Sequence, residues 1–165
     1  TLFRSQSDDV EGVVVRFADG HMVKVKSDWY VKIHKVKSLL VNERDVVAMI
    51  LNNQVDDLIP VLPQEDIEKI NLFSGRVIMA IDQAALRLEH SVNLSRNTMD
   101  RKTFALEHAS YFNPVIRGMI FQFWDKEVNV RLTYGAIVDM ILKHSTNNQS
   151  YAKVKEAFLK DIDYA

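Results

Sequence analysis

The feature that most constrains this fold is a change in hydrophobic period after the first 26 residues. Before it, two runs rich in β-branched residues, 10–17 and 21–26, flank Asp19-Gly20. Asp-Gly between two such runs is a strong β-hairpin signal, so residues 10–26 are predicted to form one. A lone hairpin is only marginally stable in water, and no later segment reads as a strand. We therefore expect it to belong to a larger sheet whose main body lies upstream.

Helical periodicity follows the hairpin. Ser27 or Asp28 can cap a helix, and four apolar residues then recur at helical spacing: Trp29, Ile33, Val36 and Leu40. A long amphipathic helix is predicted from a similar stripe: Ile67, Ile70, Phe73, Val77, Ile81, Ala84, Leu88 and Val92. The polar segment Asn93–Thr98 is expected to be a loop.

Shorter helices are predicted over residues 42–51, from the cap Asp100 to about His108, from Asn113-Pro114 onward, over 130–144 and over 150–160. Pro is favoured at the first position of a helix, which supports a start at Pro114. Phe121, Phe123 and Trp124 lie in an apolar stretch and are expected in the core. The predicted fold class is α+β and mostly α, with an N-terminal β-hairpin followed by an all-helical domain.

Composition excludes several kinds of site. There is no cysteine, which rules out disulfides, thiolate zinc sites and a cysteine nucleophile. The 21 Lys and Arg against 22 Asp and Glu argue against a generally basic nucleic-acid protein, though not against a local basic patch. No apolar run approaches the roughly 20 residues of a membrane helix. The five histidines are scattered, and the common phosphate-loop, dinucleotide and metalloprotease motifs do not occur.

The hairpin carries the most suggestive charged residues. If Asp19-Gly20 is a two-residue turn, Ala18 faces His21, and one face of the hairpin holds Glu11, Val13, Val15 and Phe17 with Met22, Lys24 and Lys26. A carboxylate beside two ammonium groups suits a ligand with phosphates and a metal ion. An ordinary solvated face with a cross-strand Glu–Lys pair accounts for the same residues.

A local basic stretch extends past the hairpin. Between positions 24 and 37, five lysines stand against one aspartate: Lys24, Lys26, Lys32, Lys35 and Lys37 against Asp28. Lys32 and Lys35 fall away from the apolar stripe and are expected to be exposed. The stretch fits either a phosphate-binding patch for a nucleic acid or a solvated helix face.

Two segments resemble the last two nucleotidyltransferase motifs, IV and V, of ATP-dependent ligases. They are residues 11–15, Glu-Gly-Val-Val-Val, and residues 24–30, Lys-Val-Lys-Ser-Asp-Trp-Tyr. The second is particularly similar to the bacteriophage T4 RNA ligase 1 family. Residues 100–107 look like a segment of that family's C-terminal domain, and residues 154–160 look like its last helix.

The resemblance implies an ATP-dependent RNA ligase that joins 5′-phosphate and 3′-hydroxyl RNA ends through ligase–AMP and RNA-adenylate intermediates, with ATP and Mg²⁺ as cofactors. Glu11 takes the place of motif IV, near the nucleotide and its metal. Lys24 and Lys26 take the places of motif V and contact phosphates. Residues 1–39 would end the nucleotidyltransferase domain, and residues 40–165 would form a helical RNA-specificity domain. Broken tRNA is the candidate substrate.

Further expectations follow from the resemblance. Lys32, Lys35, Arg101 and Lys102 are the candidate RNA contacts. A phage-encoded ligase would act in the cytoplasm of an infected bacterial cell, in RNA repair.

The sequence departs from the family in lacking the Lys-x-Asp-Gly motif of the nucleophile; Phe17 stands where its lysine would be. Together with an opening that lacks methionine, this leads us to expect an upstream N-terminal half as partner, without which the chain is inactive. The alternative is a non-enzymatic helical RNA-binding or protein-interaction module. A relative of DNA ligases or capping enzymes fits less well, because their downstream domain is usually a small β-barrel.

Overall fold

The computed structural model describes residues 10–164, which form a β-hairpin followed by helices. This confirms the predicted α+β, mostly α, fold class. The chain divides into two compact units, the first ending at Ile70 and the second beginning at Asn71. The expected domain boundary between residues 39 and 40 stays a prediction. Residues 1–9 of the expected first domain lie outside the described residues.

The hairpin consists of β1 (Gly12–Arg16) and β2 (Met22–Lys26), paired antiparallel. The hairpin is as predicted, but the predicted register is wrong by one residue. Val14 pairs with Lys24 and Gly12 with Lys26. Lys24 and Lys26 therefore share a face with Gly12 and Val14, and not with Val13, Val15 and Phe17 as the two-residue turn implied.

The turn explains this shift of register. Phe17 N donates to His21 O at 2.8 Å and Gly20 N donates to Phe17 O at 3.0 Å, which leaves three residues in the loop. Among the loop residues only Gly20 has positive φ, at 87°. A type I′ turn needs positive φ at two successive residues, whereas a three-residue loop needs one residue in the left-handed region, which glycine adopts without strain.

Three further elements lie in the first unit: α2 (Asp28–Leu39), α3 (Glu43–Leu51) and the 3₁₀ turn η1 (Ile59–Val61). Of the two predicted candidates, Ser27 caps α2, by accepting a hydrogen bond from Tyr30 N at 3.1 Å. In the predicted apolar stripe of α2, Val36 is buried and Trp29 and Ile33 are half-buried.

The long predicted helix is α4 (Gln64–Thr98), whose first residues belong to the first unit. From Ile70 onward every residue of the predicted stripe is buried, with Val77, Ile81 and Val92 fully so. The loop expected over Asn93–Thr98 is wrong, because α4 continues through these residues. Ser95 is buried, and Arg96 donates to Asn93 Oδ1 at 2.6 Å and to Lys126 O at 2.9 Å. These contacts hold a polar last turn in the helix.

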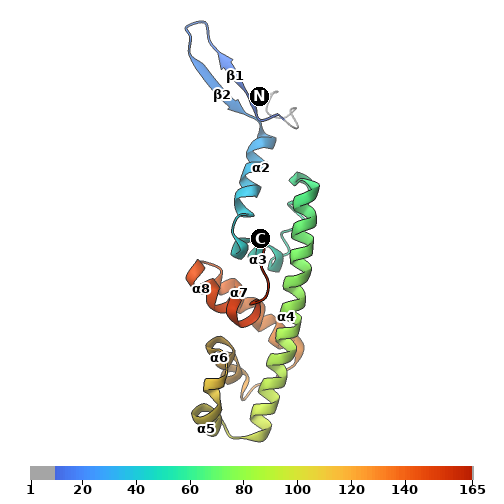
Figure 1. Ribbon diagram of the computed structural model, residues 1–165, viewed down its shortest axis with the longest axis vertical. Coiled ribbons are helices and arrows are strands. Elements are labelled where there is room, and N and C mark those ends of the chain that lie inside the picture. The colour runs from blue at the N-terminus through green and yellow to red at the C-terminus, as the bar shows by residue number, and fades with distance from the viewer. Residues whose placement is uncertain (1–9, 165) are drawn as a thin grey trace. The chain divides into compact units, whose positions relative to one another are not determined.

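After α4 the second unit runs back along the helix (Figure 1). A short helical segment comes first: α5 (Arg101–Thr103), the π-helical turn η2 (Phe104–His108) and the 3₁₀ turn η3 (Ala109–Tyr111). Then follow α6 (Pro114–Phe123), α7 (Val130–His144) and α8 (Asn148–Phe158). α7 has the predicted bounds, and α8 begins and ends two residues earlier than predicted.

Local capping explains these starts. Asp100 Oδ1 accepts from the backbone N–H groups of Lys102 and Thr103 at 2.9 and 3.0 Å. Asn113 accepts from Val115 N at 2.9 Å, with Pro114 at the first helical position. Asn147 accepts from Ser150 N, which starts α8 inside the segment expected to be a loop. Short polar side chains at these positions satisfy backbone N–H groups that the helix leaves free.

An aromatic cluster fills the core between η2 and α6. Phe104 is fully buried, and its ring centroid lies 5.1 to 5.8 Å from those of Phe112, Phe121 and Trp124. Phe123 and Trp124 are buried and Phe121 is half-buried. The expectation that these aromatic residues form core is confirmed. Elsewhere in the unit, buried Thr133 of α7 donates to Ala85 O of α4 at 3.0 Å and joins the two helices.

Candidate functional site

The predicted site residues of the hairpin lie at its open end, where the chain enters α2. Glu11 Oε1 is 2.5 Å from Lys24 Nζ, and both side chains are about half exposed, at 50% and 54%. Glu11 precedes the first residue of β1, so its side chain is not bound by strand alternation and reaches the lysine face. The expected meeting of Glu11 with Lys24 is therefore found although the predicted register is wrong.

Tyr30 completes this cluster and was not singled out from the sequence. Its hydroxyl helps to hold the pKa of Glu11 below its ordinary value, and its ring centroid lies 5.1 Å from Lys26 Nζ, within cation–π range. The signal was present: Tyr30 lies in the first turn of the helix capped by Ser27, so its side chain returns toward the strands. We call Glu11, Lys24, Lys26 and Tyr30 the hairpin cluster.

The cluster shifts the ionisation of its members. The hydrogen bond from Lys24 holds the pKa of Glu11 below its ordinary value, and the charges of Lys24 and Lys26 add to this. The hydrogen bond to Glu11 raises the pKa of Lys24. Partial burial and the neighbouring Glu11 charge raise the pKa of Tyr30. At neutral pH the site thus holds one carboxylate, two ammonium groups and a neutral phenol.

Ser27 and Gly12 position the cluster. Buried Ser27 donates from its hydroxyl to Val10 O and from its backbone N–H to Glu11 O, at 3.0 Å for the latter, while its hydroxyl caps α2. Gly12 lies against β2, where a Cβ would clash with the carbonyl oxygen of Val25 and lie 2.9 Å from Lys26 Cα. A serine and a glycine therefore set where the charged residues sit.

The candidate RNA contacts are distributed over both units. Lys32 and Lys35 are exposed on α2, as predicted, and Lys37 lies 3.9 Å from Asp66. Arg101 makes two contacts within the second unit: it pairs with Asp125 at 2.7 Å and lies over the Phe121 ring at 5.7 Å. Lys102 is exposed. Contact of any of these residues with RNA stays a prediction.

No group of three or more histidine, aspartate and glutamate side chains suited to a metal ion occurs among residues 10–164. Within the same residues, no helix has both the length and the apolar composition needed to cross a lipid bilayer.

A protein-family model described as T4 RNA ligase 1, C-terminal domain, matches residues 37–159. The chain belongs to this family. The matched region runs from the end of α2 to the end of α8 and covers both Arg101 and Lys102, whereas the hairpin cluster precedes it. No solved structure gives a significant match to the chain. The membership confirms the predicted resemblance and supports an RNA ligase role for this T4 RNA ligase 1 C-terminal domain protein.

Proposed function

We propose that this protein is the C-terminal part of an ATP-dependent RNA ligase that joins 5′-phosphate and 3′-hydroxyl ends, as in the repair of broken tRNA. In this proposal the hairpin cluster belongs to the nucleotide site and the helical region from residue 40 selects the RNA. The observation that carries it is the contact of Glu11 with Lys24, directly before a domain of the T4 RNA ligase 1 family.

The chemistry of the cluster suits nucleotidyl transfer. Such reactions depend mainly on positioning and on stabilising charge that spreads over phosphate oxygens. Lys24 and Lys26 each offer three donors and a positive charge to a phosphate. The positive charge of Lys24 is balanced by Glu11 until a phosphate competes for it. We therefore expect nucleotide binding to replace the Glu11–Lys24 contact by Lys24–phosphate and Lys26–phosphate contacts.

Glu11 also suits Mg²⁺, which needs only one or two carboxylate ligands from the protein. Mg²⁺ keeps several waters and is usually held by one or two carboxylates together with substrate phosphates. Glu11, released from Lys24, would be one such carboxylate. When bound, the ion supplies positive charge beside the phosphates. The chain's own contribution is to place a carboxylate and two ammonium groups within one small region.

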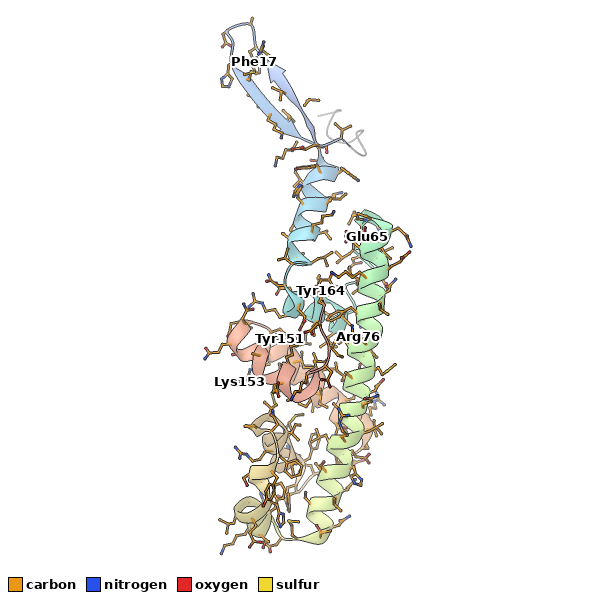
Figure 2. The ribbon with its side chains drawn as sticks, in the orientation of Figure 1. Phe17, Glu65, Arg76, Tyr151, Lys153 and Tyr164 are labelled. Carbon is orange, nitrogen blue, oxygen red and sulfur yellow. The ribbon has the colours of Figure 1, made fainter. Side chains whose placement is uncertain are left out.

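The exposed apolar side chains of the hairpin support an upstream partner. Val14 and Met22 on one face are 61% and 54% exposed, and Val15 and Val23 on the other are both 39% exposed. Phe17, near the turn, is also exposed (Figure 2). Among residues 10–164 no further strand pairs with β1 or β2. An upstream half bearing Lys-x-Asp-Gly would supply both the missing sheet and the nucleophilic lysine, which these 165 residues lack.

Adenylylation tests the proposal. The chain is mixed with radiolabelled ATP and Mg²⁺, alone and with an N-terminal half that carries Lys-x-Asp-Gly. We expect no covalent adduct from the chain alone and adduct formation by the pair. Removing one charge-stabilising donor typically costs about a hundredfold or more in rate, so K24M should show such a loss. E11Q, which removes the carboxylate proposed to hold Mg²⁺, should also lower the rate.

K126M serves as the matched control, because Lys126 is exposed in the second unit and far along the chain from the hairpin. An adduct on the chain alone would contradict the proposed division of the enzyme. Equal activity of K24M and K126M in the mixture would exclude Lys24 from the site.

The alternative, a non-enzymatic RNA-binding or protein-interaction module, draws on the fact that the family match covers only the helical region. Charge reversal separates the two. If E11K leaves ligation by the reconstituted pair intact, the hairpin has no catalytic part and the module is favoured.

A further inference from the structure

A groove on the surface of the second unit is lined by arginines that are not part of the hairpin cluster. It has a volume of about 400 Å³ and lies between α4 and the end of α8. From α4 it is lined by Arg76, Gln83 and Arg87 beside Met79, and from the other side by residues 156–162. We call this hollow the α4–α8 groove.

The three polar residues of α4 form one stripe. Gln83 follows Arg76 by seven residues, and Arg87 follows Gln83 by four. At 3.6 residues per turn, eleven residues complete about three turns, so the two guanidinium groups project from one face about 16 Å apart along the helix. The stripe places three hydrogen-bond donors along the α4 side of the groove, about 10 and 6 Å apart along the helix axis. Figure 2 shows Arg76 on α4 beside the C-terminal segment.

Of the other charged side chains that line the groove, Glu156 and Lys160 pair with each other, whereas the Asp161 carboxylate makes no ion pair among residues 10–164. Lys160 lies 3.2 Å from Glu156, and Lys155 lies 2.7 Å from Asp163. Arg76 donates one hydrogen bond, to Asp161 O at 3.3 Å, and a guanidinium has further N–H groups that can donate to a ligand. Arg87 is exposed, and within residues 10–164 its side chain makes no ion pair or hydrogen bond. A guanidinium over a hollow is thus left for a ligand.

Two further hollows share lining residues with the groove. Arg87 also lines a smaller hollow of about 150 Å³ with Ser91 and Phe112. Glu156 borders another apolar hollow, whose rim carries exposed Lys153 on α8. The groove shares Arg87 with the first of these hollows and Glu156 with the second. The cations Arg76, Arg87 and Lys153 are thus spaced along neighbouring hollows rather than gathered at one point.

We propose that the α4–α8 groove binds the sugar–phosphate backbone of RNA, with Arg87 as the principal phosphate contact and Arg76 as the second. This inference rests on the proposed function. Arginine, glutamine and serine side chains are typical partners of phosphate and sugar oxygens, and planar guanidinium suits bidentate phosphate binding. Cations spaced along a concave surface match a ligand whose charges repeat, and the family membership favours RNA over an acidic protein segment.

The test is direct binding by the 165-residue chain. A fluorescein-labelled single-stranded RNA of 20 nucleotides is titrated by anisotropy at several salt concentrations against wild type, R87Q, R87K and R131Q. Arg131 is the matched control, because it is exposed on α7 in the same unit and lines none of the three hollows. Circular dichroism checks that each variant is folded, and labelled poly-glutamate is titrated in parallel.

We expect R87Q to bind RNA about tenfold more weakly and to reduce the salt slope by about 0.7, the value for one lost phosphate contact on a single strand. R87K, which keeps the charge, should lose less, and R131Q should match wild type.

Equal weakening by R87Q and R131Q, or no effect of R87Q, would contradict RNA binding by the groove. The chain would then bind RNA elsewhere on its surface. Poly-glutamate binding as tight as RNA binding would overturn it in favour of an acidic protein ligand. If wild type does not bind RNA, RNA binding by the groove and the RNA-selecting role of the helical region are both contradicted. The proposed role of the hairpin cluster is tested separately by adenylylation.

Discussion

At the scale of single residues, two small residues, Gly12 and Ser27, determine where the charges of the hairpin lie. Gly12 permits an approach of β2 that any Cβ would block. Ser27 joins the start of β1 to the start of α2 through three hydrogen bonds. Glu11 and Tyr30 flank these positions, and so they meet Lys24 and Lys26. The charged residues carry the proposed chemistry, and their neutral neighbours supply the geometry.

The Glu11–Lys24 contact has a definite dependence on pH. Because the folded state lowers the pKa of Glu11, its contribution to stability is present above the unfolded carboxyl pKa and is lost as the pH falls through the folded value. The raised pKa of Lys24 acts at the other end: that contribution is lost as the pH rises through the folded lysine pKa. The contact is therefore complete at neutral pH.

Replacing Lys24 tests this assignment. K24M removes the hydrogen bond and the charge that favour ionised Glu11, so the pKa of Glu11 should rise in the variant. The measurement is the ¹³C chemical shift of the Glu11 carboxyl followed over a pH titration by NMR. K35M, which changes an exposed lysine of α2, should leave the Glu11 titration nearly where it is in wild type. An unchanged Glu11 titration in K24M would show that the two side chains do not interact in solution.

At the scale of elements, the π-helical turn η2 inserts a buried phenylalanine between α5 and α6. Phe104 contacts three other aromatic rings, whereas Leu106, two residues on in the same turn, is 74% exposed. One turn of chain thus presents a core residue and a solvent-facing residue of similar apolar character. The fold of this segment depends on the first and should be indifferent to the second.

The pair Phe104 and Leu106 gives a matched test. F104A should lower the free energy of unfolding by about 3 to 5 kcal/mol, since it removes a fully buried ring and leaves a cavity. L106A should change it by less than about 0.5 kcal/mol. Urea unfolding is followed by the fluorescence of Trp124, with Trp29 replaced by Phe in all variants so that the signal reports the second unit. Similar losses for both variants would contradict the assigned burial of Phe104.

At the scale of the whole molecule, the two units differ in how their apolar residues are used. In the second unit, α4, α6, α7 and α8 all contribute fully buried side chains, among them Val77, Met119, Ile137 and Val154. In the hairpin of the first unit, most large apolar side chains on both faces are exposed instead, and Val25 is half-buried. The second unit contains a complete core, and the hairpin shows surfaces that suit a further layer.

Hydrogen exchange measures this difference. Backbone amides of β1 and β2 should exchange at least about a hundredfold faster than those in the middle of α7, because few buried contacts oppose local opening of the hairpin. Exchange followed by mass spectrometry resolves the two regions. Adding the N-terminal half should slow the exchange of the hairpin and leave α7 unchanged. Hairpin amides as protected as those of α7 in the chain alone would contradict the expected need for a partner sheet.

Local sequence determined much of this fold. The apolar stripe from Ile70 to Val92, the caps Ser27, Asp100 and Asn113, and the hairpin around Asp19-Gly20 were all predicted and are present. Each depends on a few consecutive residues, because helical period, capping and turn formation are set by the backbone over one or two turns. The meeting of Glu11 with Lys24 was expected from a register that is wrong, and it occurs because Glu11 lies before the first residue of β1.

The tertiary structure decided the rest. The register depended on the backbone angles of the turn residues, and Asp19-Gly20 permits more than one kind of turn. The last turn of α4 stays helical because Arg96 reaches Lys126 O, 30 residues away. The α4–α8 groove exists because α8 ends beside Arg76 and Arg87. The sequence by itself determined the hairpin and most of the helices, but not the last turn of α4. Which side chains meet across those segments was decided by contacts between distant residues, which no local pattern encodes.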